Sequence, residues 1–269
     1  MLVEGRHFLP GADPRSLGHK ALAVNLSDLA AMGAAPRWAM LALALPAADE
    51  AWLAAFSQGF FALAGRHGVD LVGGDITRGR ELTISITAIG QVRADVALYR
   101  SGARPQDDIW VSGELGSAAL ALVHPEIAAA AAKLHEPEPR VELGERLQGL
   151  ARAAIDVSDG LVGDLQHILE RSGVGAVVHY EAIPRIDAFA SLDNPELEKD
   201  CVLSGGDDYE LLFTAARERR EELLALSHEL GVRLTRIGAV QRGEAHLAVV
   251  GRDGRPLSFK AGFDHFGGR

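Results

Sequence analysis

The chain has 269 residues, 48% of them hydrophobic and 24% charged, a composition typical of a folded protein rather than a disordered or membrane-spanning one. The formal net charge of −10 argues against a surface that neutralises nucleic-acid phosphates, so no nucleic-acid partner is expected. No apolar run approaches the roughly 20 residues that cross a bilayer, and the opening MLVEGRHFLPG lacks the apolar core of a signal peptide. We therefore expect a cytoplasmic protein without a membrane partner, and its length favours two domains.

The first part of the chain predicts alternating helices and strands. Asp13 and Pro14 are typical of a helix start, with the acid as N-cap and proline at the first helical position. Gly33 is a typical stop for this helix. The elements expected after it are a buried strand over 38–45, a helix over 49–67, a short buried strand over 69–72 followed by a glycine-rich turn, and an alternating strand over 81–92.

A polar, turn-rich segment over 93–108 separates this half from the next, and we place the boundary there, with domains over residues 1–96 and 97–269. Strands are expected over 109–111, at the start of IDVSD, and over 176–180, 209–214, 234–240 and 247–250. Helices are expected over 116–123, 126–134, 140–152, 159–172 and 217–230. The polar segment 187–200 receives no element. The single cysteine, Cys201, fits a small packed hydrophobe.

Six aspartates stand beside small or turn-forming residues: Asp28 in NLSDLAAMG, Asp75 in LVGGDITRG, Asp156 and Asp159 in IDVSDGL, and Asp207 and Asp208 in SGGDDYE. Neighbouring acids repel unless a cation joins them, and Mg²⁺ takes oxygen ligands from carboxylates and phosphates. Each stretch alone also has a simpler interpretation, because glycine and aspartate are common in turns and Ser158 or Asp159 fits a helix cap. Asp156 ends an apolar strand, where open α/β sheets hold ligands, and is harder to explain as structural.

Other kinds of chemistry are excluded by missing motifs. The chain has no G-x-x-x-x-G-K-[ST] phosphate loop, and SGVGAVV lacks the third glycine of a dinucleotide fingerprint. It also has no G-x-S-x-G elbow and no context for a cysteine nucleophile. The histidines lack metal-ligand spacing, and His7 taken alone fits a loop residue without a role. Phosphate chemistry organised by aspartates and a divalent cation remains.

Seven stretches in fixed order resemble the thiamine-monophosphate kinase family: LVEGRHFLPG, LGHKALAVNLSDLAAMGAAPRW, LVGGDITRG, YRSGARPQDD, AIDVSDGLVGDL, LSGGDDYELLF and GFDHF. The resemblance covers nearly the whole chain. It implies an α+β, two-domain aminoimidazole ribonucleotide synthetase-like fold, with an N-terminal dimerising α+β domain and a C-terminal α/β domain. It also implies a homodimer that transfers the γ-phosphoryl group of ATP directly to thiamine monophosphate, assisted by Mg²⁺, to give thiamine diphosphate.

The same resemblance assigns roles to individual residues. The family's Mg²⁺ ligands match Asp28, Asp75, Asp156 and Asp159. Asp75 and Asp156 are the expected catalytic residues. Nucleotide or phosphate contacts match Gly74, Asp75, Arg100 and Ser158, and contacts to the thiamine substrate match His7, Asp207 and Phe263. On this basis Gly73 and Gly74 let the chain approach the triphosphate while Asp75 holds the metal.

Two departures from the family pattern bear on these expectations. The family more often reads SGGEDYE, so Asp207 is one methylene shorter than the usual glutamate. Upstream of LVEG the family has a Gly-Asp-Asp segment and a Thr-Asp pair with further Mg²⁺ ligands, and this chain begins after them. The alternative is therefore a truncated, catalytically impaired homologue that acts as a folded dimeric or ligand-binding protein. Selenophosphate synthetase and the hydrogenase-maturation relatives rely on a reactive or terminal cysteine, which the internal Cys201 does not match.

Overall fold

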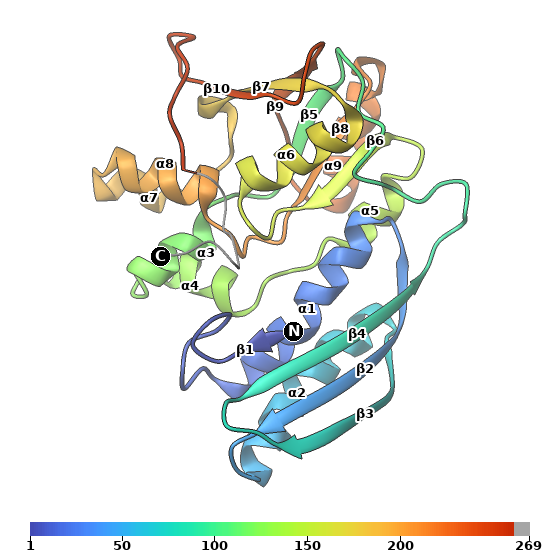
Figure 1. The fold of residues 1–269 in the computed structure, drawn as a ribbon, viewed down its shortest axis with the longest axis vertical. Helices are drawn as coiled ribbons and strands as arrows, with labels where there is room; N and C mark the ends of the chain where they lie inside the picture. Colours follow the sequence, from blue (N-terminus) through green and yellow to red (C-terminus); the bar gives the residue numbers. More distant parts are fainter. Residues whose placement is uncertain (261–269) are drawn as a thin grey trace.

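The computed structural model describes residues 1–260 and contains two β-sheets, one in each half of the chain (Figure 1). The first sheet has the order β1-β4-β2-β3 and consists of β1 (Leu2–Val3), β2 (Ala35–Leu45), β3 (Asp70–Arg78) and β4 (Thr83–Gln91). Strands β2 and β3 pair in parallel, whereas β4 is antiparallel to both of its neighbours. Helix α1 (Pro14–Ala31) packs against α2 (Glu50–His67), β4 and β2.

The two helices begin where local hydrogen bonds favour a start. The side chain of Asp13 accepts a hydrogen bond from the backbone N–H of Ser16 at 2.8 Å, and Pro14 occupies the first turn of α1. Asp49 caps α2 in the same way, and Gly68 ends that helix in the left-handed conformation. The predicted helices over 13–32 and 49–67 are therefore confirmed.

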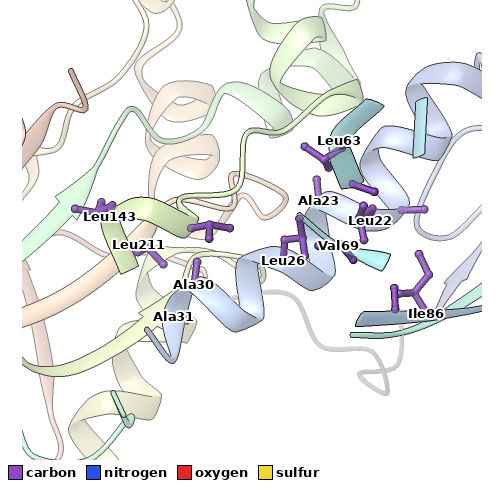
Figure 2. Close-up of a cluster of buried hydrophobic side chains, with 14 of the residues drawn as sticks. Leu22, Ala23, Leu26, Ala30, Ala31, Leu63, Val69, Ile86, Leu143 and Leu211 are labelled. Carbon is purple, nitrogen blue, oxygen red and sulfur yellow. The ribbon is translucent and has the colours of Figure 1, made fainter. Parts of the chain in front are cut away.

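Helix α1 lies between the two halves and is buried on several sides. Its residues Leu22, Leu26 and Ala30 belong to one hydrophobic cluster with residues from both halves of the chain (Figure 2), including Leu63, Val69, Ile86, Leu143 and Leu211. Burying one such leucine contributes about 1.5–3 kcal/mol relative to leaving it exposed. The shared cluster therefore fixes α1, and the polar residues that it carries, against the second half.

The second sheet has the order β10-β7-β9-β5-β8-β6. Its strands are β5 (Asp108–Ser112), β6 (Ala151–Asp156), β7 (Gly175–His179), β8 (Leu211–Ala215), β9 (Leu234–Gln241) and β10 (Leu247–Val250). Its helices are α3 (Ser117–Val123), α4 (Ala128–His135), α5 (Val141–Arg146), α6 (Leu161–Ser172), α7 (Ala188–Leu192), α8 (Pro195–Ser204) and α9 (Arg220–Leu230). Within residues 1–260, β10 and β7 form the only parallel pair of this sheet. The boundary after residue 96 stays a prediction.

Two strands expected in the first half are present but differ from their prediction in burial or length. Strand β2 is not buried on both faces, because Trp38 and Met40 are exposed while Ala39 between them is buried. Strand β3 continues through Gly73 and Gly74, where we expected a turn, and most of it is exposed. In the part of the chain that the structure describes, it lies at the edge of the sheet and pairs only with β2, so glycines are tolerated within it.

Two helix expectations in the second half were wrong. The helix expected over 140–152 ends at Arg146, because Ala151–Asp156 pairs with β8 and the chain must turn to reach it. The segment 187–200 contains α7 and most of α8, although we expected no element there. Asn194 caps α8 by accepting a hydrogen bond from Leu197 N–H at 3.1 Å. Asn194 followed by Pro195 is typical of a helix start and could have predicted α8. The many charged residues after it favoured a loop instead.

Two expectations from composition can be compared with the structure. Cys201 is buried on α8, as expected for a packed hydrophobe, and burial raises the pKa of its thiol to about 11. None of the helices within residues 1–260 is both long enough and apolar enough to span a bilayer.

Candidate active site

Helix α1 and strand β6 bring Asp28 and Asp156 together, although the two residues come from different halves of the chain. Ser27, next to Asp28 on α1, is buried and donates its hydroxyl hydrogen bond to Asp156 Oδ2 at 2.7 Å. Burial, together with the negative charge of Asp28, raises the pKa of Asp156 to about 6, although the Ser27 hydrogen bond and the charge of Arg100 act in the opposite direction. The two carboxylates and Arg100 therefore share one electrostatic environment.

Asp28 itself reaches the surface, yet nearby protein atoms remove part of its hydration. This desolvation raises the pKa of Asp28, and the positive charge of Arg100 partly offsets the effect. Asp156 ends β6, as expected, but β6 pairs in an antiparallel manner with β8, so its role as a ligand-binding residue at a strand end stays a prediction. Asp156 faces α1.

The loop between β6 and α6 carries Ser158 and Asp159. Their backbone N–H groups both donate to Asp164 Oδ2, each at 3.0 Å, so one buried carboxyl on α6 holds two consecutive peptides. Burial raises the pKa of Asp164 to about 7, against the lowering effect of these hydrogen bonds. Neither Ser158 nor Asp159 caps α6, whose N-cap is Gly160 without a side-chain cap. Asp164 was not among the residues predicted from the sequence, although it is an acid on an otherwise apolar helix face.

A second loop, over 205–210, lies directly against this one. Asp207 N–H donates to Ser158 O at 2.9 Å, and Tyr209 N–H donates to Val157 O at 2.8 Å. Gly206 has to be glycine at this contact, because a Cβ atom there would lie 2.3 Å from Ser158 O. The predicted substrate contact Asp207 is thus tied to the loop of the predicted nucleotide contact Ser158.

A cavity of about 110 Å³ opens beside Asp207, between α1, the first residues of the chain and α4. Its polar walls include His7, Lys20 and Asp207, and its apolar walls include Phe8, Leu17, Leu122 and Leu134. His7 is held in place because its Nδ1 accepts a hydrogen bond from Val3 N–H at 3.0 Å. Two of the three predicted substrate contacts therefore line one cavity. The third, Phe263, lies outside the described residues.

Asp75 and Gly74 lie elsewhere. They are exposed on β3, at the edge of the first sheet away from β6 (Figure 1). Asp75 Oδ1 accepts a hydrogen bond from Ile76 N–H at 2.9 Å, and within residues 1–260 no interaction joins Asp75 to Asp28 or Asp156. A Cβ on Gly74 would lie 1.8 Å from Leu41 O, so this glycine permits the close approach of β2 to β3.

The carboxylates of the site fit Mg²⁺ by their donor chemistry, although no three of the candidate side chains already converge as metal ligands in the part of the chain that the structure describes. Asp28, Asp156 and Asp159 offer the oxygen donors that this ion prefers. The charge of Asp28 raises the pKa of Asp156, and a cation between the two would remove this repulsion.

The raised pKa values of the buried carboxyls predict an unusual dependence of stability on pH. Burial raises the pKa values of Asp156, Asp164 and Asp208 to about 6, about 7 and about 8. The folded protein then binds protons more tightly than the unfolded chain, whose aspartates titrate near pH 4. We expect the free energy of unfolding without metal to fall as the pH rises from about 4 to about 8, as measured by urea denaturation.

In Asp208→Asn the free energy of unfolding should fall less steeply with rising pH than in the parent, because asparagine does not titrate. Asp193→Asn is the matched control, since Asp193 is exposed at the end of α7 and should leave the pH profile unchanged. A parent protein that becomes more stable over this pH range would contradict the expectation.

Comparison with known proteins identifies the family. Residues 1–92 match the N-terminal domain and residues 104–250 the C-terminal domain of AIR synthase related proteins. The thiamine-monophosphate kinase of Escherichia coli K12 is 45% identical over 98% of this chain and 84% of its own length. That of Bacillus subtilis is 34% identical over 98% of this chain and 86% of its own length.

Solved structures agree with this result. The thiamine-monophosphate kinase of Stenotrophomonas maltophilia K279a is 47% identical and superimposes with a TM-score of 0.89, covering 95% of this chain and 84% of that one. The structure of AaThiL complexed with AMPPCP and TMP is 32% identical, with a TM-score of 0.85 over 98% of this chain and 85% of its own. Hydrogenase maturation protein HypE, at 23% identity and a TM-score of 0.76, shares the fold. Since relatives well above 30% identity span nearly all of this two-sheet structure, the chain belongs to the thiamine-monophosphate kinase family.

Proposed function

We propose that the protein catalyses the ATP-dependent phosphorylation of thiamine monophosphate to thiamine diphosphate. The observation that carries this proposal is the position of the cavity: His7 and Asp207 line it, and Asp207 N–H is hydrogen-bonded to the loop that carries Ser158 and Asp159. A substrate in the cavity would therefore lie beside the residues assigned to the nucleotide. The relatives are named kinases, and the alternative of a protein that only binds ligands is not favoured.

The reaction needs positioning and charge neutralisation more than proton transfer. The acceptor is a phosphate monoester with a second pKa of about 6, so its attacking oxygen is already ionised at neutral pH. The oxygen forms a bond to the γ-phosphorus of ATP while the bond from that phosphorus to the β–γ bridging oxygen breaks, and ADP leaves. Arg100 and the backbone around Ser158 would hold the phosphates, as electrostatic catalysis of this transfer requires.

Asp28, Asp156 and Asp159 are the residues that would hold Mg²⁺ in this proposal. When bound, the ion supplies positive charge against the phosphate oxygens. The chain's own contribution is to keep these carboxylates in place through α1, Ser27 and Asp164. Cytoplasmic location stays a prediction from the sequence.

We also propose a homodimer formed through the first sheet. One face of this sheet exposes Trp38, Met40 and Ile89, since Trp38 pairs with Ile89 and Met40 lies two residues further along β2; this is an apolar surface of the kind that marks an interface. Asp75 lies on the exposed strand β3, and Figure 1 shows β3 far from β6, the strand that ends at Asp156. In this dimer, β3 of one protomer approaches the site of the other and contributes Asp75 to it.

The proposed reaction is tested by incubating the protein with Mg-ATP and thiamine monophosphate and separating the products by chromatography. Thiamine diphosphate and ADP should form in equal amounts, and thiamine without its phosphate should not be converted. ATP hydrolysis that thiamine monophosphate does not change, with no thiamine diphosphate, would overturn the proposal.

Asp164 provides a prediction about the loop that it holds. Asp164→Ala should raise the KM for ATP and lower kcat by about ten- to a hundredfold, because two backbone N–H groups lose their acceptor and the loop loses its fixed shape. Asp164→Asn keeps an acceptor oxygen and should stay within about threefold of the parent. Steady-state kinetics of both variants checks this, with thermal unfolding as a control for folding. Equal defects in the two variants would show that the hydrogen bonds are not what matters.

A further inference from the structure

Lys20 is a buried ammonium group on α1 that points into the cavity. Its side chain is only 5% exposed, and it lines the cavity together with Asp207. Lysine is almost never so deeply buried unless it is paired. The partner of Lys20 is Asp207, whose Oδ2 accepts a hydrogen bond from Lys20 Nζ at 2.8 Å.

Tyr209 holds the other oxygen of the same carboxylate. Its hydroxyl donates to Asp207 Oδ1 at 2.8 Å. Burial raises the pKa of Tyr209 well above its ordinary value, and the neighbouring Asp207 adds to the effect, so the hydroxyl stays protonated as a donor. Each oxygen of Asp207 therefore has one donor from the protein and a further lone pair available.

The backbone around this carboxylate is unusual. Asp207 and Tyr209 both have positive φ angles, 68° and 51°, which side-chain-bearing residues seldom adopt. Such conformations persist where the surrounding structure enforces them, and they concentrate at ligand sites. Here the backbone hydrogen bonds to the loop over 157–158 and the ion pair to Lys20 enforce them.

The charges of the pair also matter for what the cavity can bind. The ammonium of Lys20 offsets the carboxylate of Asp207, so the cavity offers acceptor oxygens without an uncompensated buried charge. Asp207 is 31% exposed at its side chain, so an entering molecule can reach those oxygens. An N–H donor of a heteroaromatic amine is the complementary group.

We propose that Lys20 is a positioning residue for the substrate: it orients Asp207, with Tyr209, so that this carboxylate accepts a hydrogen bond from an N–H group of thiamine monophosphate. The inference rests on the proposed function. Lys20 acts through Asp207 and does not contact the nucleotide in this scheme, so its effect is confined to the affinity for thiamine monophosphate.

Steady-state kinetics of Lys20→Met, Asp207→Asn and the double variant tests this. Lys20→Met should raise the KM for thiamine monophosphate at least about tenfold, while the KM for ATP stays within about twofold and kcat within about threefold. The double variant should have the same KM for thiamine monophosphate as Asp207→Asn alone, because the second substitution removes a group whose effect is already lost. Lys199→Met is the matched control, since Lys199 pairs with Glu196 outside the cavity and should behave as the parent.

Each outcome decides the matter. An unchanged KM for thiamine monophosphate in Lys20→Met, independent effects in the double variant, or equal losses for both substrates with a lower melting temperature would overturn the inference. If Lys20→Met does not fold, Tyr209→Phe removes only the hydroxyl on Asp207 Oδ1, and a KM for thiamine monophosphate that it leaves unchanged overturns the inference as well. A parent protein that forms no thiamine diphosphate overturns the proposed function, whereas an active parent with an unaffected Lys20→Met overturns only the role of Lys20.

Discussion

Asp156→Asn is expected to lower kcat for thiamine diphosphate formation by about a thousandfold, which corresponds to ~4 kcal/mol in the activation barrier. Asp156 ends β6, is buried against α1 and shares its environment with Asp28 and Arg100. A neutral amide cannot replace the charge that holds a cation against phosphate oxygens. The amide still fills the same volume, so the fold should survive.

The effect is measured by single-turnover and steady-state kinetics at saturating substrates. Asp193→Asn makes the same chemical change at an exposed position just after α7 and should retain full activity. Ser27→Ala should fall between the two, because it removes only the hydrogen bond to Asp156 Oδ2. Asp156→Asn activity within about threefold of the parent, less than ~1 kcal/mol in the barrier, would sink the assignment of Asp156.

The second large effect concerns Asp75. We expect Asp75→Asn to be nearly inactive as a homodimer, and we expect activity to return when it is combined with the equally inactive Asp156→Asn. In a mixed dimer whose sites each take Asp75 from one protomer and Asp156 from the other, one of the two sites contains both intact residues. Random mixing then restores about a quarter of the parent activity, since half of the dimers are mixed.

Co-expression with two different affinity tags isolates the mixed dimer, whose activity should be about half that of the parent dimer. A mixed dimer that stays inactive would mean that Asp75 serves the site of its own chain, despite its place on the outer strand. Light scattering provides the control, and a monomer at micromolar concentration would contradict the dimer itself.

The parts of the fold that could be predicted are those whose cause lies within a few residues. Asp13 with Pro14, and Asp49 with Gly68, make their hydrogen bonds or turns inside the segment that they delimit, so the sequence contains the whole signal. The glycines of LVGGDITRG were misread because the atom that excludes a side chain at Gly74 belongs to Leu41 on the neighbouring strand. Tertiary contact decided that conformation.

The site was predictable only as a set of acids. Two of their supporting residues, Lys20 and Ser27, were missed because the partner is distant in the chain: Lys20 and Asp207 are 187 residues apart, and Ser27 and Asp156 are 129 apart. No periodicity or local spacing reveals such pairs. Whether Asp28, Asp75, Asp156 and Asp159 hold metal stays a prediction, as do the nucleotide contacts.

The hydrogen bonds between the loops over 157–160 and 205–210 have a thermodynamic consequence. Val157 N–H donates to Glu210 O, while Asp207 and Tyr209 donate in return, so neither loop can be displaced without the other. A ligand that orders one loop thereby orders both, and the conformational entropy lost at that step is not lost again when the second ligand arrives. Nucleotide and thiamine monophosphate should therefore bind with positive cooperativity, and by linkage each increases the affinity for the other by the same factor.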